Sequence, residues 1–287
     1  MKLALIKPKS VNVDPWAQEF ANCGVDVLEN SVQPDCDFIL CASISQLNKL
    51  EYFHNMYPDI PMINYNWDLY EWIWTSPGGY DWKKYGAFLN KSAEIWCPSD
   101  EVVLRTQEYY NCGEKCKVIK TFVRLFDYPE EKIKDKRYIF QPMRYYHEDR
   151  NFGWLKKACK ELDIRLVESL HKASEEEFKK IIANCSFLVC EYYEASTGGL
   201  TLLEGYNLGK PILISDSKYM GGRDYFGDDA IYFKHDSYDN FKHMLLELWN
   251  NTEKYTRTLE ESKKLTKEYT VEIMVKVMHQ RLLELSI

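Results

Sequence analysis

The stretch CEYYEASTGGLTLLEGYNLGKPILIS, residues 190–215, contains the end of one apolar strand, a loop with a Gly-Gly pair, an apolar helix and a second apolar strand. Gly198 and Gly199 lie directly before the helix, and Gly209 is expected to end it. Strand, loop, helix and strand in this order are typical of a parallel sheet covered by helices. Because glycine backbone and a helix amino terminus attract phosphate oxygens, the loop favours a phosphate-containing ligand.

Two glutamates flank the Gly-Gly pair. Glu204 lies one turn into the helix and Glu194 lies in the loop before it. A carboxylate can accept two hydrogen bonds from adjacent hydroxyls, so Glu204 suits a ribose and Glu194 another polyol. Carboxylates for hydroxyls beside amides for phosphates together favour a nucleotide-sugar site. The alternative is that the glycines form only a turn and that the helix dipole alone explains a glutamate near the helix start.

Short apolar runs alternate with helical patterns along the whole chain. The expected strands are Lys2–Ile6, Val25–Leu28, Asp37–Cys41, Pro61–Asn64, Glu94–Cys97, Lys117–Thr121, Tyr138–Gln141, Ile164–Val167, Ser186–Cys190, Pro211–Ser215 and Ala230–Phe233. The expected helices are Val13–Cys23, Ser45–Met56, Ser99–Cys112, Asp149–Glu161, Ser174–Asn184, Leu200–Leu208, Tyr238–Asn250, Thr252–Tyr269 and Val271–Leu285. This alternation predicts an α/β protein with parallel sheets.

The chain of 287 residues is too long for one typical core. Residues 128–137 are polar, charged and proline-containing, as in a linker. We therefore predict two doubly wound, Rossmann-like domains, 1–130 and 137–287, facing a central cleft. Ligands of such sheets bind at the carboxyl ends of the strands, and the cleft between the domains is the expected site. The final helix carries an apolar stripe, Ile273, Val277, Leu282 and Leu283, that is expected to pack back on the N-terminal domain.

Composition excludes several classes of protein. The chain is 45% hydrophobic and 28% charged, which is typical of a globular protein. A net charge of -7 argues against coating nucleic acid by charge alone. Nine scattered cysteines without a CxxC pair are expected to be reduced, and no signal peptide or membrane-spanning run is apparent. We expect a cytoplasmic enzyme.

Several segments together resemble a known family. "GGLTLLEGYNLGKPILISDS", the later "GDDAIYF", the upstream "FQPMRYYHEDRNFGWLKKACKEL" and "EIWCPSDEVVLRTQEYYNCGEKCKVIKTFV" are similar to family 4 retaining glycosyltransferases of GT-B fold. The resemblance is clear over residues 94–250. The N-terminal domain is short for this family, and Lys7-Pro8-Lys9-Ser10 stands where the family has a glycine-rich loop.

The resemblance implies roles for individual residues of the C-terminal domain. Glu204 matches the ribose-binding carboxylate, and Arg144 and Arg150 match the basic pair that holds the diphosphate, for which guanidinium groups are well suited. The loop whose backbone contacts the donor sugar and diphosphate matches Thr197, Gly198, Gly199, Leu200 and Thr201.

Two parts of the donor site depart from the family pattern. Ser196 stands eight positions before Glu204, where the family has its first glutamate, and Glu194 stands ten positions before. Either Glu194 takes the sugar-binding role in a longer loop, which we favour, or Ser196 replaces the glutamate. The nucleotide base is expected against the loop that contains Ser169 and Leu170.

On the acceptor side, "NYNWDLYEWIW" follows the strand Pro61–Asn64. The family often has a histidine near this position, and here the polar candidates are Asn66 and Asp68. Asp68 is expected to orient an acceptor hydroxyl. Trp67 and the aromatic residues that follow it could stack on an acceptor or could instead pack in a core. The segment Thr75–Trp82 is expected to be a mobile loop that gates the site.

The resemblance implies transfer of a sugar from a nucleotide sugar, most consistent with a UDP-sugar, with retention at the anomeric carbon. No DxD motif lies where a metal-dependent enzyme would need one, so no metal is predicted. The acceptor could be a glycan, a lipid-linked sugar, a protein or a hydroxymethylated base in DNA, and the sequence leaves the oligomeric state open. The alternatives are a degenerate, non-catalytic nucleotide-sugar-binding protein and another GT-B enzyme such as a phosphorylase or an epimerase.

Overall fold

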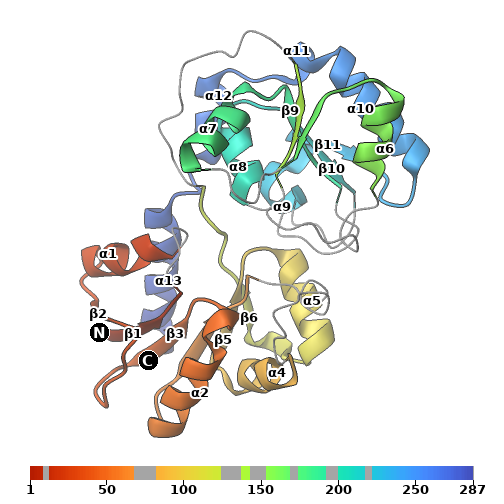
Figure 1. Ribbon diagram of the computed structural model, residues 1–287. Helices are drawn as coiled ribbons and strands as arrows, with labels where there is room; N and C mark the ends of the chain where they lie inside the picture. Colours follow the sequence, from red (N-terminus) through yellow and green to blue (C-terminus); the bar gives the residue numbers. More distant parts are fainter. Residues whose placement is uncertain are drawn as a thin grey trace. The chain divides into compact units, whose positions relative to one another are not determined.

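The computed structural model describes residues 1–8, 13–67, 82–123, 137–142, 153–168, 174–191, 200–216 and 222–286. The chain forms two compact units (Figure 1). Unit 1 comprises Met1–Phe122 and Tyr269–Ile287, and unit 2 comprises Val123–Glu268. Each unit is built around one parallel sheet, as the alternation of strands and helices predicted.

The described part of unit 1 contains a six-stranded sheet in the order β2-β1-β3-β4-β5-β6. Its strands are β1 (Lys2–Ile6), β2 (Asp26–Glu29), β3 (Phe38–Cys41), β4 (Met62–Tyr65), β5 (Glu94–Cys97) and β6 (Cys116–Val118). Its helices are α1 (Asp14–Asn22), α2 (Leu47–Met56), α4 (Trp82–Lys91), α5 (Asp100–Tyr110) and α13 (Val271–Leu285), with short 3-10 turns at Ile44–Gln46 and Gly113–Lys115.

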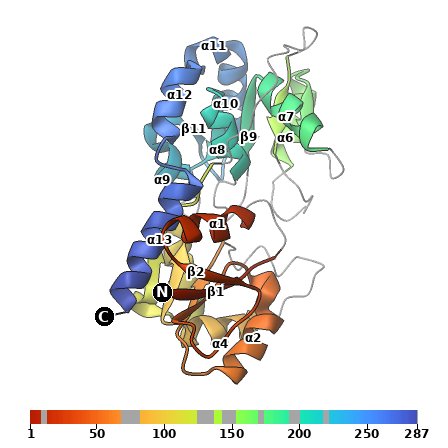
Figure 2. The same cartoon turned by 90° about the vertical axis from the view of Figure 1, so that its left-hand side faces the viewer.

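The first and last helices of the chain cover the same face of this sheet. α1 and α13 lie side by side in both views (Figures 1 and 2). The core on this face combines alternate strand residues with residues of the two helices: Leu3, Leu5, Leu40, Ile63, Tyr65, Trp96, Trp16, Phe20, Met274, Val275, Met278 and Leu282. On the opposite face, Asn66 contacts Tyr85 of α4 and Thr106 of α5, and Lys84 of α4 pairs with Glu51 of α2.

The buried stripe of α13 differs from the predicted one. Leu282 is buried as expected, but Ile273, Val277 and Leu283 are 38%, 46% and 42% exposed. The helix buries Met274, Val275, Met278 and Leu282 instead. These positions follow the three- and four-residue spacing of one helix face. The helix thus carries two apolar stripes, and only packing against α1 and the sheet decides which one is buried.

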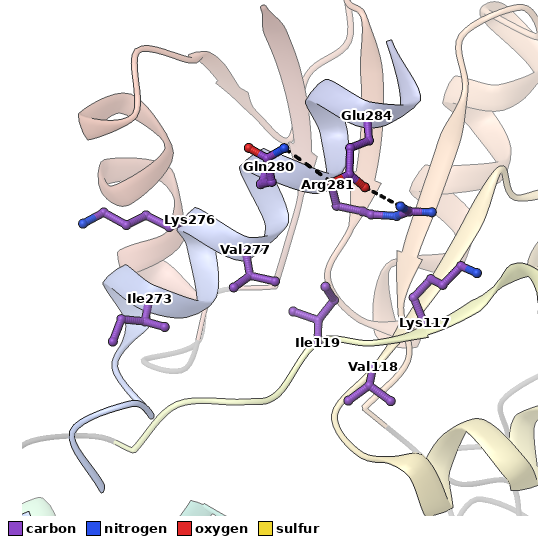
Figure 3. Close-up of a pocket in the computed structure, with 9 residues that line it drawn as sticks. All are labelled: Lys117, Val118, Ile119, Ile273, Lys276, Val277, Gln280, Arg281 and Glu284. Atoms are coloured by element: carbon purple, nitrogen blue, oxygen red, sulfur yellow. Dashed lines mark hydrogen bonds and ion pairs between the residues drawn. The ribbon is translucent and has the colours of Figure 1, made fainter. Parts of the chain in front are cut away.

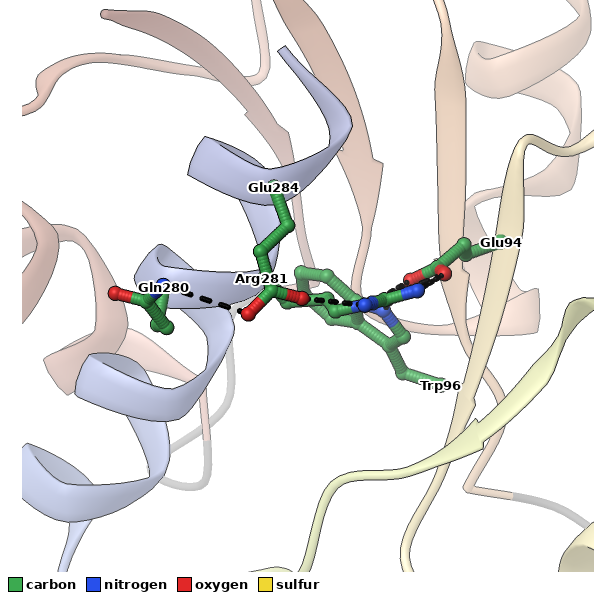
Figure 4. Close-up of polar contacts among 5 residues, drawn as sticks. All are labelled: Glu94, Trp96, Gln280, Arg281 and Glu284. Carbon is green, nitrogen blue, oxygen red and sulfur yellow. Dashed lines mark hydrogen bonds and ion pairs between the residues drawn. The ribbon is translucent and has the colours of Figure 1, made fainter. Parts of the chain in front are cut away.

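A buried carboxylate joins α13 to the sheet (Figure 4). Glu94, the first residue of β5, accepts hydrogen bonds from Arg281 Nε at 3.0 and 2.9 Å and from its terminal guanidinium nitrogen. Trp96 Nε1 donates to the same carboxylate at 3.0 Å. Arg281 also pairs with Glu284, and these carboxylates raise the pKa of Arg281. The Glu94 side chain is only 5% exposed, so the Arg281 guanidinium neutralises a charge that water hardly reaches.

The described part of unit 2 contains a five-stranded parallel sheet in the order β11-β10-β9-β7-β8. Its strands are β7 (Ile139–Gln141), β8 (Leu166–Glu168), β9 (Phe187–Cys190), β10 (Ile212–Ser215) and β11 (Ile231–Phe233). Its helices are α6 (Trp154–Glu161), α7 (Glu175–Asn184), α8 (Leu200–Asn207), α9 (Gly222–Phe226), α10 (Tyr238–Asn250), α11 (Thr252–Tyr255) and α12 (Leu259–Thr266), with a 3-10 turn at Gly227–Asp229.

Helices cover both faces of the second sheet. The core on one face is formed by strand residues with α6 and α10: Ile139, Phe187, Val189, Leu213, Phe233, Leu155, Ala158, Cys159, Phe241, Leu245 and Leu248. On the other face, α8 lies so close to β9 that a Cβ atom at Gly205 would stand 2.4 Å from Leu188 Cδ1. Gly209 has a φ of 75° after α8, which is the helix stop that the sequence predicted.

One helical assignment from the sequence was wrong, and one helix was missed. Thr252–Tyr269 forms two helices rather than one, because the Thr258 side chain starts a new helix through a capping box with Glu261. The Arg257 amide between them donates to Gly209 O at 3.1 Å, outside either helix. The sequence also gave no signal for α4, whose first residue falls in the segment expected to be a loop.

All nine cysteines are free, and eight of them are buried. None of the described helices has both the length and the apolar character that crossing a bilayer requires.

Candidate functional site

The sheet of unit 2 has one point where the strand order reverses, between β7 and β9. The chain continues from β7 to β8 on one side, whereas β9, β10 and β11 extend on the other. At such a switch point the helices that follow the two strands lie on opposite faces, which opens a crevice at the carboxyl ends of the strands. The described residues at these ends are Gln141 on β7 and Glu191 directly after β9.

Glu191 connects three elements at this edge. Its Oε2 accepts a hydrogen bond from the Leu155 amide at 2.7 Å, and its Oε1 accepts one from Gln141 Nε2 at 3.3 Å. Leu155 is the second residue of α6, where the amide has no partner within the helix. The Glu191 side chain is therefore a long-range cap for α6. Glu191 is only 1% exposed.

The surroundings of Glu191 favour its neutral form. Burial raises the pKa of Glu191 to about 7, although the two hydrogen bonds favour the charged form. The Glu168 carboxylate at the end of β8 raises the pKa further, and Lys156 opposes this. Lys156 Nζ lies 3.2 Å from Glu168 Oε1. A carboxyl group with this pKa changes its charge near neutral pH, which is typical of functional sites.

Helix α8 carries two predicted donor-site residues whose burial the structure describes, Thr201 and Glu204. Glu204 is completely buried. Thr201 is half-buried, and Leu200 is the first residue of the helix. Because Gly205 has no side chain, this part of α8 can lie close to Leu188 of β9. The structure thus places Glu204 on the helix that directly follows the 192–199 connection from β9.

The remaining predicted site residues lie outside the described part of the chain. These are Asp68, Arg144, Arg150, Ser169, Leu170, Glu194, Ser196, Thr197, Gly198 and Gly199. Their roles remain predictions. The described residues bound two of the segments that contain them: Pro142 precedes and Gly153 follows one segment, and Glu191 and Leu200 enclose another.

Two acceptor-side candidates in unit 1 have structural roles. Both amide atoms of Asn66 are satisfied within the unit, since Nδ2 donates to Thr106 Oγ1 at 2.8 Å and Oδ1 accepts from Tyr85 at 3.2 Å. Trp67 stacks on Trp16 at 6.0 Å, and its Nε1 donates to Ala42 O at 2.8 Å. The core interpretation therefore holds for Trp67.

The sheet of unit 1 also reverses its order, between β1 and β3. At the carboxyl end of β1, Lys7 is 7% exposed, and its Nζ lies 2.8 Å from Asp14 and 2.9 Å from Glu29. Burial opposes the charge of Lys7, but the two carboxylates outweigh it and raise the pKa of Lys7. A lysine whose charge is matched by two carboxylates therefore lies at the carboxyl end of β1.

A pocket of about 510 Å³ lies elsewhere in unit 1, between α13 and the chain around β6 (Figure 3). It is lined by Lys117, Val118, Ile119, Ile273, Lys276, Val277, Gln280, Arg281 and Glu284. The exposed stripe of α13 forms one wall. Lys276 pairs with Glu272, and Glu284 pairs with Arg281. Because apolar side chains and the aliphatic parts of α13 residues make up most of its surface, this pocket is a poor match for a nucleotide diphosphate.

Among the described residues, no group of three or more His, Cys, Asp or Glu side chains is arranged to hold a metal ion.

Sequence reasoning missed Glu191. It singled out the two glutamates that follow, Glu194 and Glu204. The available signal was a carboxylate directly after an apolar strand. Its significance depends on β9 pairing with β7, and strand order cannot be read from one sequence.

No protein-family model matches this chain, and no curated protein matches it. Solved structures, however, match nearly its whole length. Sucrose-phosphate synthase (tll1590) from Thermosynechococcus elongatus has a TM-score of 0.75 at 11% identity, with 99% of each chain covered. Anabaena Alr3699/HepE in complex with UDP-glucose has a TM-score of 0.67 at 12% identity, covering 99% of this chain and 100% of that one. WaaG, a glycosyltransferase involved in lipopolysaccharide biosynthesis, has a TM-score of 0.63 at 11% identity, covering 98% and 99%.

At these identities the similarity shows the fold. The chain has the α/β fold of the GT-B glycosyltransferases, with one parallel sheet in each of two domains, which confirms the fold class predicted from the sequence.

Proposed function

We propose that this protein is a glycosyltransferase that moves a sugar from a nucleotide-sugar donor to an acceptor hydroxyl. The observation that carries the proposal is the match of the whole chain, both sheets included, to glycosyltransferases, one of which was solved with UDP-glucose. Fold alone hosts many functions. The reversal of strand order between β7 and β9 supports the same proposal, because doubly wound sheets bind nucleotides at such switch points.

In this proposal unit 2 binds the donor. Glu204 accepts hydrogen bonds from the ribose hydroxyls, and the backbone from Ser196 to Thr201 contacts the sugar and diphosphate. Arg144 and Arg150 hold the diphosphate, and the segment with Ser169 and Leu170 faces the base. Glu194 binds the transferred sugar. The position of α8 is consistent with this role for Glu204, because the helix begins directly after the connection from β9.

The finer mechanism is transfer with retention from a UDP-sugar, without a metal ion. The acceptor oxygen forms a bond to the anomeric carbon on the face that the diphosphate leaves. The bond from that carbon to the phosphate oxygen breaks, and the acceptor proton passes to the leaving phosphate. The protein holds the substrates and stabilises the charge that develops on the diphosphate, for which Arg144 and Arg150 have suitable chemistry.

Unit 1 would bind the acceptor, with Asp68 orienting its hydroxyl. The acceptor class is open between a glycan, a lipid-linked sugar, a protein and a modified base in DNA.

Donor binding can be tested with UDP, GDP, ADP and CMP and their common sugars, using thermal shift and then titration calorimetry. We expect stabilisation by UDP and UDP-sugars in the wild type and its loss in Glu204→Gln. Lys276→Ala, in the pocket of unit 1, is a control that should bind like the wild type. A wild-type protein that none of these compounds stabilises would overturn the proposal.

Turnover separates an enzyme from a degenerate binder. We expect slow hydrolysis of the bound donor when no acceptor is present, and Glu204→Gln should abolish it. The anomeric configuration of the first product, read by proton NMR, distinguishes retention from inversion. Unchanged turnover in excess EDTA would agree with a metal-independent reaction.

A further inference from the structure

Glu191 accepts two hydrogen bonds through an ionisable carboxyl group, although a neutral side chain could cap α6 equally well. It joins residues 50 and 36 positions away, Gln141 and Leu155, by hydrogen bonds to both carboxylate oxygens. Gly153, at the N-cap position of α6, provides no side-chain cap. The amino end of α6 therefore depends on Glu191 for an acceptor at Leu155.

A buried carboxylate held by neutral donors costs stability. The contacts described for Glu191 come from an amide nitrogen and a side-chain amide, and its environment favours the uncharged form. A glutamine could accept from Leu155 at the same distance without burying a charge. A group that lowers stability at the carboxyl edge of a sheet is a candidate for function.

The position of Glu191 gives it control over two chain segments. It directly precedes residues 192–199, and the helix that it caps directly follows residues 143–152. The predicted donor contacts Glu194, Gly198, Arg144 and Arg150 belong to these segments. A shift of α6 relative to β9 would move the ends of the two segments apart. Sub-ångström positioning of this kind strongly affects binding and catalysis.

We propose that Glu191 is a positioning residue of the donor site: its carboxylate holds the amino end of α6 against the carboxyl ends of β7 and β9, and so fixes the described residues from which the connections 143–152 and 192–199 start or end. The proposal rests on the proposed glycosyltransferase function, and it adds a residue that does not itself contact the donor. The ionised carboxylate accepts both hydrogen bonds. When one oxygen carries a proton, that oxygen cannot accept from Gln141 in the same way.

The titratable and charged groups around Glu191 come from two elements, α6 with Lys156 and Cys159 and β8 with Glu168. Lys156 and Glu168 are paired with each other. Burial and the nearby carboxylates raise the pKa of Cys159 to about 12, so this thiol stays neutral near pH 7. Glu191, whose pKa is raised to about 7, changes its charge around neutral pH.

The test is titration calorimetry of the full chain with UDP and UDP-glucose at about pH 6 and about pH 8. UDP-glucose is the better probe for the pH comparison, because its phosphates are fully ionised throughout. Glu191→Gln keeps the acceptor for Leu155 and loses the titration. Glu191→Leu keeps the approximate size and loses both acceptors. Glu94→Gln is the matched control, since it alters a buried glutamate beside a strand of unit 1.

We expect a graded series of UDP-glucose affinities. Relative to the wild type at pH 8, Glu191→Gln should bind about 3-fold more weakly and Glu191→Leu at least about 10-fold more weakly, as for the loss of one and two hydrogen bonds. The wild type at pH 6 should approach the affinity of Glu191→Gln, whose own affinity should not depend on pH. Glu94→Gln should lower thermal stability and leave affinity unchanged.

Each other outcome is informative. Equal affinities for the wild type, Glu191→Gln and Glu191→Leu would overturn the positioning role and leave the glycosyltransferase proposal intact. If Glu191→Leu does not fold, the pH dependence of the wild type against that of Glu191→Gln decides, and identical pH profiles would overturn the role. A wild type that binds neither UDP nor UDP-glucose would overturn both proposals.

Discussion

Glu94 in unit 1 and Glu191 in unit 2 are both buried glutamates at an end of a parallel strand, yet their surroundings differ. Glu94 begins β5 and is held by the guanidinium of Arg281 and by Trp96 (Figure 4). Glu191 follows β9 and is held by a backbone amide and by Gln141. One carboxylate is neutralised by a cation in direct contact, and the other is stabilised by neutral donors.

The two glutamates also lie at opposite edges of their parallel sheets. Glu94 lies at the amino edge, where it ties the last helix of the chain to β5. Glu191 lies at the carboxyl edge, at the point where the strand order reverses. The guanidinium of Arg281 neutralises the buried charge of Glu94 by direct contact, which suits a permanent connection. An unmatched carboxyl group at a ligand-binding edge retains a charge that pH or a ligand can change.

The largest effect is expected from Arg281→Leu. This change leaves Glu94 buried without its cation, so the free energy of unfolding should fall by about 3 kcal/mol. Urea unfolding of the full chain measures it. The double variant Glu94→Gln/Arg281→Leu should recover part of the loss, because no buried charge remains. A loss no larger in Arg281→Leu than in the double variant would show that Glu94 and Glu191 do not differ as described.

The pH dependence of stability tests the other carboxylate. Because the pKa of Glu191 is raised from 4.5 to about 7 in the folded protein, its favourable contribution is fully present below about pH 4.5 and is lost as the pH rises towards 7. The wild type should therefore lose up to about 3 kcal/mol relative to Glu191→Gln over this range. Urea unfolding of both proteins at about pH 5 and pH 8 provides the comparison. The same difference between them at both pH values would contradict a raised pKa.

Gly205→Ala tests how closely α8 must approach β9. The added Cβ would stand 2.4 Å from Leu188 Cδ1, so either the side chain or the helix must move. Overpacking of this kind costs roughly 1–3 kcal/mol. If α8 moves, Glu204 moves with it, and UDP-glucose should bind more weakly. Thermal unfolding and calorimetry measure both effects. Adding Leu188→Ala should restore space and affinity, and a failure to do so would argue against the contact.

The smallest effect is expected from Lys276→Ala, in the pocket beside α13 (Figure 3). Its ion pair with Glu272 is exposed to solvent, so stability should not change measurably. Affinity for UDP-glucose should also stay unchanged. Weaker donor binding in this variant would place part of the donor site in unit 1 and contradict the contrast drawn between the two units.

Local structure was largely predictable from the sequence. Each expected strand has a counterpart in the described structure, from Lys2–Ile6, with unchanged bounds, to Ala230–Phe233, observed as Ile231–Phe233. Ser99 and Ser174, the first residues of two expected helices, cap the observed helices, the latter with a full capping box. These features depend on residues within a few positions of one another, so apolar runs, caps and glycines reveal them. Glu204 was placed on its helix for the same reason.

Tertiary structure decided what local pattern could not. α13 has two apolar stripes of similar strength, and only the sheet and α1 select Met274 and Met278 over Ile273 and Val277. Gln141 and Glu191 meet because β9 pairs with β7, although α6, β8 and α7 lie between these strands in the sequence. Strand order depends on which faces and edges bury the most apolar surface together, which is a property of the whole sheet. The sequence by itself therefore determined the elements and the fold class that they suit, and the packing of distant strands alone determined that Glu191 caps the helix that follows β7.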